Sequence, residues 1–128
     1  MSESTRAIIL SHWSYANARD WEGFASLLDP ELRYAVPQTR EYIEGAPGYL
    51  DMFRTWPGDW HATVKSLVCE ASTAVCIIDF VVGAEAITGI SVFELAAGRI
   101  VKVMDYWPEP YEPPPRASQH MKRGAGEA

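Results

Sequence analysis

Two aspartates stand in strand-like segments that are otherwise almost wholly apolar, and they are the residues best placed to do chemistry. Asp105 alternates with Val101 and Val103, and alternate side chains of an extended chain share one face. Asp79 has apolar neighbours on both sides. An ionised carboxylate is costly to bury alone, so an acid in such a place is either paired or put to use.

The two strands that carry these acids should be separated by a single intervening strand, which puts them roughly 10 Å apart. Two acids on one concave face can act as general acid and general base on a ligand held between them. We therefore predict Asp105 and Asp79 as catalytic residues. The alternative is a carboxylate satisfied by neighbouring hydroxyl, indole or backbone donors.

Histidines supply two further candidates. His12 falls in the predicted N-terminal helix and is the third candidate catalytic group, and His61 begins a predicted strand and is a candidate ligand contact. For each, the alternative is a histidine at the surface. The histidines are scattered and the cysteines do not form a pair at metal spacing, so we predict no metal site. No phosphate loop or nucleotide fingerprint occurs, and we predict no cofactor.

Large aromatic side chains and a methionine recur on the predicted helices and strands, a pattern that suits a lined cavity or an ordinary core. The residues predicted to line a ligand site, besides His61, are Trp13, Tyr15, Tyr34, Met52, Phe53, Trp56 and Trp107.

Composition narrows the class of protein. The chain has 128 residues, enough for one domain, and a net charge of −6, which disfavours nucleic acid and anionic membranes as partners. The N-terminus lacks the pattern of a signal peptide, and no apolar run approaches the length of a membrane span. Two cysteines cannot make a disulfide framework. We predict a soluble cytoplasmic protein.

Periodicity predicts three helices followed by a run of strands. The first helix covers residues 4–19, a second begins at Asp20, which can cap it, and a third opens at Gly45. The predicted strands cover 32–36, 42–44, 60–70, 73–82, 86–95 and 99–107. Short links between the last four predict antiparallel neighbours. We expect one α+β domain over residues 1–107 and an extended Pro-rich tail over 108–128.

This order of elements resembles the NTF2-like superfamily, which includes SnoaL-like proteins, ketosteroid isomerase and limonene epoxide hydrolase. The resemblance is carried by Ala18-Arg19-Asp20-Trp21, by Gly45, and by Gly98-Arg99-Ile100 leading into Asp105-Tyr106-Trp107. It implies a cystatin-like cone, in which three N-terminal helices pack on a strongly bent, mostly antiparallel six-stranded sheet. It also implies a deep pocket between helices and sheet, and often a dimer through the outer face of the sheet.

The resemblance is incomplete at the family's reaction sites. Asp79 and Asp105 match the paired aspartates of limonene epoxide hydrolase, but Ile77 stands where that enzyme has an arginine. At the positions of ketosteroid isomerase's tyrosine and base this chain has His12 and, near the second, Ala35 or Val36. Neither reaction is implied in full.

We expect a SnoaL-like pocket protein for a small hydrophobic, ring-containing ligand. Its chemistry would be cofactor-independent isomerisation, cyclisation, dehydration or hydrolysis assisted by the aspartates. The alternative is a non-catalytic ligand-binding or dimerisation module. A homodimer is predicted because the apolar set that should face outward, Ile78, Phe80, Met104 and Tyr106, needs covering.

Overall fold

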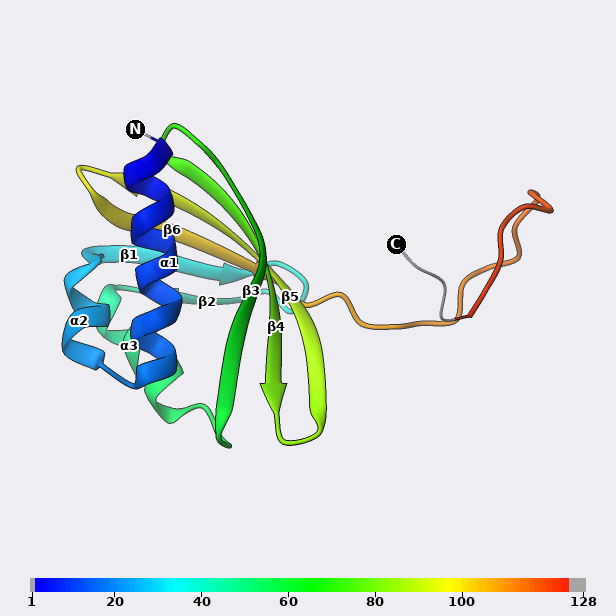
Figure 1. The fold of residues 1–128 in the computed structure, drawn as a ribbon, viewed down its shortest axis with the longest axis horizontal. Coiled ribbons are helices and arrows are strands. Elements are labelled where there is room, and N and C mark those ends of the chain that lie inside the picture. Colours follow the sequence, from blue (N-terminus) through cyan, green and yellow to red (C-terminus); the bar gives the residue numbers. More distant parts are fainter. Residues whose placement is uncertain (1, 125–128) are drawn as a thin grey trace.

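A computed structural model describes residues 2–124, and the predicted helices and strands are present in the predicted order (Figure 1). The helices are α1 (Ser2–Ala18), α2 (Trp21–Ser26) and α3 (Ala46–Thr55). The strands are β1 (Leu28–Val36), β2 (Glu41–Glu44), β3 (Trp60–Glu70), β4 (Thr73–Val82), β5 (Glu85–Ala96) and β6 (Arg99–Tyr106). The predicted three-helix α+β architecture is confirmed.

The ends of α2 and β1 show how local chemistry sets the boundaries. The Asp20 carboxylate accepts a hydrogen bond from the Gly23 N–H, as an N-cap should. β1 begins four residues earlier than predicted, at Leu28, and runs through Pro30. Its pairing with β6 is irregular between Leu28 and Arg33, and such an irregularity is where a strand tolerates proline.

The six strands form one open, mixed sheet in the order β2-β1-β6-β5-β4-β3. Only the β1–β6 pair is parallel; the other neighbours are antiparallel. The sheet bends strongly, and the helices lie together on its concave side, with α1 against β3 and α3 against β1 (Figure 1).

Side-chain alternation on β4 decides which face of the sheet each residue occupies. Cys76, Ile78 and Phe80 are buried on the concave face, whereas Val75 and Ile77 are exposed. The prediction that Ile78 and Phe80 face outward is therefore wrong. Both faces of this strand are apolar, so alternation alone could not orient it.

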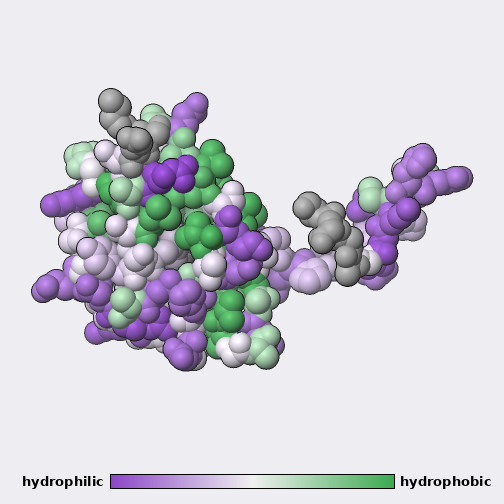
Figure 2. Space-filling view, viewed as in Figure 1, coloured by the Kyte–Doolittle hydropathy of each residue, from purple (hydrophilic) through white to green (hydrophobic). Residues whose placement is uncertain are grey.

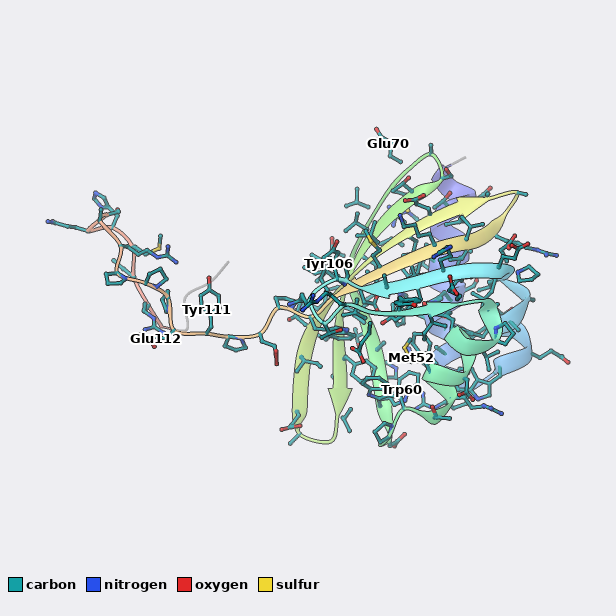
Figure 3. The ribbon with its side chains drawn as sticks, turned by 180° about the vertical axis from the view of Figure 1, so that it is seen from behind. Met52, Trp60, Glu70, Tyr106, Tyr111 and Glu112 are labelled. Carbon is teal, nitrogen blue, oxygen red and sulfur yellow. The ribbon has the colours of Figure 1, made fainter. Side chains whose placement is uncertain are left out.

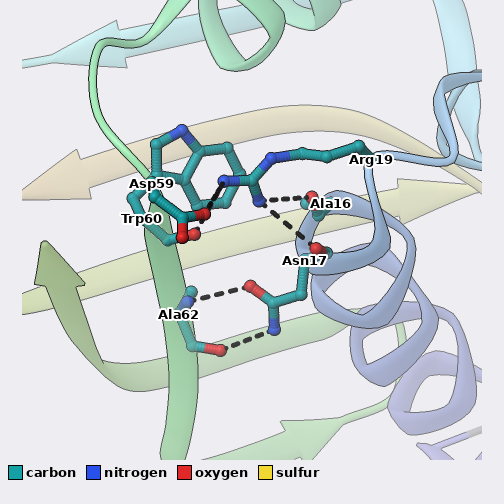
Figure 4. A network of polar contacts seen from close by, with 6 residues as sticks. All are labelled: Ala16, Asn17, Arg19, Asp59, Trp60 and Ala62. Atoms are coloured by element: carbon teal, nitrogen blue, oxygen red, sulfur yellow. Dashed lines mark hydrogen bonds and ion pairs between the residues drawn. The ribbon is translucent and has the colours of Figure 1, made fainter.

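A polar network attaches the end of α1 to β3 (Figure 4). The Asn17 amide donates to the Ala62 carbonyl and accepts from its N–H, both at 2.8 Å. The Arg19 guanidinium donates to the carbonyls of Ala16 and Trp60 at 3.1 and 2.7 Å and lies 3.7 Å from the centroid of the Trp60 ring. The hydrogen bond holds the backbone of Trp60, and the cation–π interaction holds its ring.

Beyond Tyr106 the described chain contains no helix or strand, and it leads away from the body (Figures 1 and 3). Tyr111 is 74% exposed, and Arg123 pairs with Glu112 at 2.8 Å within this segment. Figure 2 shows hydrophobic residues gathered over the strands of the body and a mostly hydrophilic tail. The division of the chain at residue 107 stays a prediction, and residues 125–128 lie outside the described part.

None of the described helices has the length and hydropathy to cross a bilayer.

The convex face of the sheet carries two apolar rows that cross three strands. Register places Val75, Val92 and Met104 in one row. Ile77, Ile90 and Tyr106 form the other row. These rows replace the predicted outward set, of which only Met104 and Tyr106 lie on this face.

A homodimer through the convex face stays a prediction. We expect sedimentation at micromolar concentration to show a dimer, because two such faces would cover each other's apolar rows. Ile77→Glu should give a monomer, since it would bury a charge in the interface. Leu10→Glu, at an exposed apolar position on α1, is the control and should remain dimeric. A monomeric wild-type protein would contradict the prediction.

Candidate functional site

An apolar chamber of about 170 Å³ lies between the concave face of the sheet and the helices. Six of the residues predicted as ligand contacts line it: Trp13, Tyr34, Met52, Phe53, Trp56 and Trp107. Four apolar lining residues were not predicted: Trp60, Ile78, Phe80 and Ile87. The remaining lining residue is Asp105. Met52 and Trp60 are labelled in Figure 3.

A second, wider chamber of about 470 Å³ adjoins the first and has a more polar wall. The two share the lining residues Tyr34, Met52, Trp56 and Trp107. The turn between β1 and β2 adds the polar residues Thr39 and Arg40 to the second chamber, and the first residue of β2 adds Glu41. Trp56 is 50% exposed, so the shared wall includes a partly open aromatic ring. We call the two spaces the inner and outer chambers.

Asp105 sits on the wall of the inner chamber with only 5% of its surface exposed. The hydroxyls of Tyr34 and Ser91 donate to its two carboxylate oxygens, each at 2.6 Å. Register explains this meeting: Ser91 on β5 pairs directly with Asp105 on β6, and Tyr34 on β1 lies beside Val103.

Burial raises the pKa of Asp105, and the hydrogen bonds from Ser91 and Tyr34 act in the opposite direction. Burial also raises the pKa of Tyr34, and the charge of Asp105 adds to that effect. In the described part of the chain no basic side chain forms an ion pair with Asp105. Asp105 is therefore a buried carboxyl group with a raised pKa and no ion-pair partner among the described residues, and it is placed to exchange a proton with a ligand.

Asp79 lies on the opposite face of the sheet, and the prediction that it shares the chamber with Asp105 is wrong. Its carboxylate is 3.5 Å from the ammonium of Lys65, and its side chain is 36% exposed. The neighbours that bracket it in β4, Ile78 and Phe80, take the concave face instead. Asp79 is a solvated partner in a surface ion pair.

His12 is completely buried in the core and does not line either chamber. Its Nε2 lies 2.8 Å from the hydroxyl of Tyr49, and its ring centroid lies 4.8 Å from that of Phe24 and 5.2 Å from that of Phe93. Burial lowers the pKa of His12 to about 3, so the ring is neutral at physiological pH. The predicted catalytic role of His12 in the chamber is therefore not supported by its position.

The two other predicted ligand contacts also lie elsewhere. His61 is exposed on β3, because its neighbour Trp60 takes the inward position, and its Nδ1 lies 3.3 Å from the Thr63 hydroxyl. Tyr15 packs over Gly23 of α2, where a β-carbon would come within 2.5 Å of its ring. Neither residue lines the inner or the outer chamber.

Trp107 is held in the chamber wall by two features. A β-carbon at Gly89 on β5 would lie 2.6 Å from the Trp107 ring. The indole can pack against β5 there only because glycine has no side chain, and we call this position the seat of Trp107. The Gln38 amide accepts from the Trp107 N–H at 2.6 Å and donates to its carbonyl at 3.2 Å. The turn between β1 and β2 therefore fixes the backbone and Gly89 fixes the ring.

Residues 11–103 match the SnoaL-like domain family. This match covers most of the chain. The chain belongs to the SnoaL-like domain family. It is thereby a member of the NTF2-like superfamily, and the resemblance predicted from the sequence is confirmed. Among proteins of curated function, none matches the chain.

Solved structures show the same fold. A protein of Kribbella flavida DSM 17836, named for an inferred ketosteroid isomerase activity, is 37% identical with a TM-score of 0.91. That match covers 98% of this chain and 93% of the other. An LEH-like epoxide hydrolase of M. tuberculosis is 14% identical with a TM-score of 0.71, covering 84% of each chain. An NTF-2 like protein of unknown function from Burkholderia xenovorans LB400 is 21% identical with a TM-score of 0.79, covering 96% of this chain and 97% of the other.

Proposed function

We propose that the inner chamber binds a small, apolar, ring-containing molecule and that Asp105 exchanges a proton with it. The observation that carries this proposal is a single buried carboxyl group on an otherwise apolar and aromatic wall. A pocket of this kind is the usual form of a small-molecule site, with few polar groups placed among many apolar ones. Both the donor and the acceptor are one side chain of this protein, so the reaction needs no cofactor.

An isomerisation is the reaction that one carboxylate can perform by itself. Asp105 would accept a proton from one atom of the ligand and return it to another, which restores the carboxylate at the end of the cycle. Tyr34 and Ser91 orient the carboxylate through their hydrogen bonds. The similarity to a protein named for ketosteroid isomerase activity supports this class. Two-acid hydrolysis is less well supported, because Asp79 lies outside the chamber.

The second candidate is a ligand-binding protein without catalysis. The observation that favours it is that each oxygen of Asp105 already accepts a hydrogen bond from a hydroxyl group of the protein. In such a protein the carboxylate would contribute only to the shape of the chamber and to its affinity for the ligand. The two candidates share the chamber and differ in whether Asp105 is needed for turnover.

Filling the seat of Trp107 tests the chamber as a ligand site. In Gly89→Val the new side chain would displace the indole, because even a β-carbon there would lie 2.6 Å from the ring. We expect affinity for single-ring compounds, measured by calorimetry or native mass spectrometry, to fall at least tenfold. The free energy of unfolding should fall by about 1–3 kcal/mol, the usual cost of overpacking.

Thr88→Val is the matched control, since Thr88 is the neighbouring position on β5 but is exposed on the other face. It should leave ring-compound affinity unchanged. Equal affinity in wild type and Gly89→Val, with the variant folded by circular dichroism, would show that the ligand binds elsewhere.

A further inference from the structure

The inner chamber combines aromatic rings with one carboxyl group, and this combination favours positive charge. We propose that its ligand is an apolar ring compound with a basic nitrogen, bound as an ammonium ion beside Asp105. The inference rests on the proposed function, that the chamber takes a ring-containing molecule, and names the polar group that this molecule carries.

The aromatic wall is continuous along one side of the chamber. Phe80 stacks on Trp60 with 5.5 Å between ring centroids. Its contacts with Trp107 and Trp56 are T-shaped, with centroid distances of 5.8 and 6.4 Å. The face of an aromatic ring carries a partial negative charge, and indole is the strongest of the three ring types in attracting a cation. A cation that contacts the face of one of these rings is therefore stabilised by it, whereas an anion is not.

The carboxyl group supplies the counter-charge. In the described chain, no lysine, arginine or histidine lines the inner chamber, so Asp105 has no cationic partner of its own. An amine that enters as the free base takes the proton from the carboxyl group: the O–H bond breaks, an N–H bond forms, and a carboxylate–ammonium pair results. The hydroxyls of Tyr34 and Ser91 already donate to the two oxygens of Asp105, and these hydrogen bonds stabilise the carboxylate of the pair.

Size and overall charge agree with a small amine. A cavity of about 150 Å³ can hold a benzene ring, and the inner chamber of about 170 Å³ therefore admits one ring with a short chain. The protein has a net charge of −6, which raises the local concentration of cations over that of anions. The one cationic residue of the chamber walls, within the described residues, is Arg40, and it belongs to the outer chamber.

Three probes that share a 2-phenylethyl group test the assignment by calorimetry at pH 7: 2-phenylethylamine, 2-phenylethanol and 3-phenylpropionate. We expect the amine to bind at least tenfold more tightly than the alcohol, and the carboxylate to bind most weakly. In Asp105→Asn the preference for the amine over the alcohol should fall below threefold. Asp79→Asn removes the same charge outside the chamber and should keep the wild-type preference.

Trp56→Leu provides a second variant. It should not prevent folding, because Trp56 is 50% exposed. It should weaken the amine more than the alcohol, since only the cation loses a ring face. Alcohol binding equal to or tighter than amine binding would overturn the assignment, as would a preference that survives in Asp105→Asn. If none of the three probes binds, the proposed ligand chamber fails; if all bind without preference, only the amine assignment fails.

Discussion

Lowering the pH from 7 to 4 is expected to cost the folded protein about 3 kcal/mol through His12 alone. The pKa of His12 is lowered by burial from 6.5 to about 3 in the folded state. Between these two values the unfolded chain binds a proton that the folded chain rejects. Stability from this residue is therefore complete above pH 6.5 and is lost as the pH falls toward 3.

The surroundings of His12 explain why the folded state cannot accept that proton. The ring is fully buried among aromatic side chains, and its Nδ1 has no hydrogen-bond partner among the described residues. Its Nε2 meets a neutral hydroxyl, that of Tyr49, rather than a carboxylate. No carboxylate forms an ion pair with His12 among the described residues, so the cost of removing an imidazolium from water is not offset by an opposite charge.

Urea unfolding at pH 7 and pH 4 measures the effect. Asp105 also contributes to the total change, so the useful quantity is the difference between wild type and His12→Gln, whose side chain does not titrate. The loss of stability should be about 3 kcal/mol larger in wild type than in this variant. His61→Gln, at an exposed position on β3, should lose as much as wild type. An equal loss in wild type and His12→Gln would contradict the assignment of the acid sensitivity to His12.

The order of helices and strands could be predicted because each signal is local. Asp20 caps α2, and short links between the last four strands force them to be antiparallel neighbours. The start of β1 could not be predicted, since Pro30 reads as a helix stop and a strand can also accept it beside an irregular pairing.

The faces of β4 and β6 show why one aspartate was placed correctly and the other was not. Around Asp105 the polar residue Lys102 marks the outward face of β6, so the alternation has a reference. β4 has apolar residues on both sides of Asp79, and its orientation follows only from pairing with β3 and β5. If the strand is turned so that each side chain takes the opposite face, the residue of the surface ion pair would lie in the chamber and the chamber-lining residues would lie at the surface.

The hydrogen-bond partners of Asp105 required long-range pairing that no local pattern contains. Ser91 is one small polar residue in a strand. It donates a hydrogen bond to the carboxylate only because β5 pairs in register with β6. Tyr34 was predicted as a lining residue, but its contact with Asp105 depends on the parallel β1–β6 pair, which joins the two ends of the domain. The seat of Trp107 at Gly89 depends on tertiary structure in the same way.

Asp105→Asn is expected to reduce turnover about 10²- to 10⁴-fold, the range associated with loss of a general acid or base. An amide has nearly the shape of the carboxyl group, and Tyr34 and Ser91 can still hydrogen-bond to it. The variant therefore removes proton transfer with little change in the chamber. Exchange of C–H for C–D in a panel of single-ring compounds, followed by NMR in D₂O, measures the rate. Asp79→Asn should keep the wild-type rate because Asp79 lies on the convex face.

The same substitution should change stability in a direction opposite to that expected for His12. Because burial raises the pKa of Asp105, its contribution to stability is complete at low pH and is lost as the pH rises through the folded value. The stability of Asp105→Asn relative to wild type should therefore increase between pH 4 and pH 7.

If wild type binds ring compounds but exchanges no proton in any of them, the non-catalytic candidate is the correct one. A group that destabilises the folded protein at neutral pH and yet contributes nothing to turnover would then owe its place to ligand affinity.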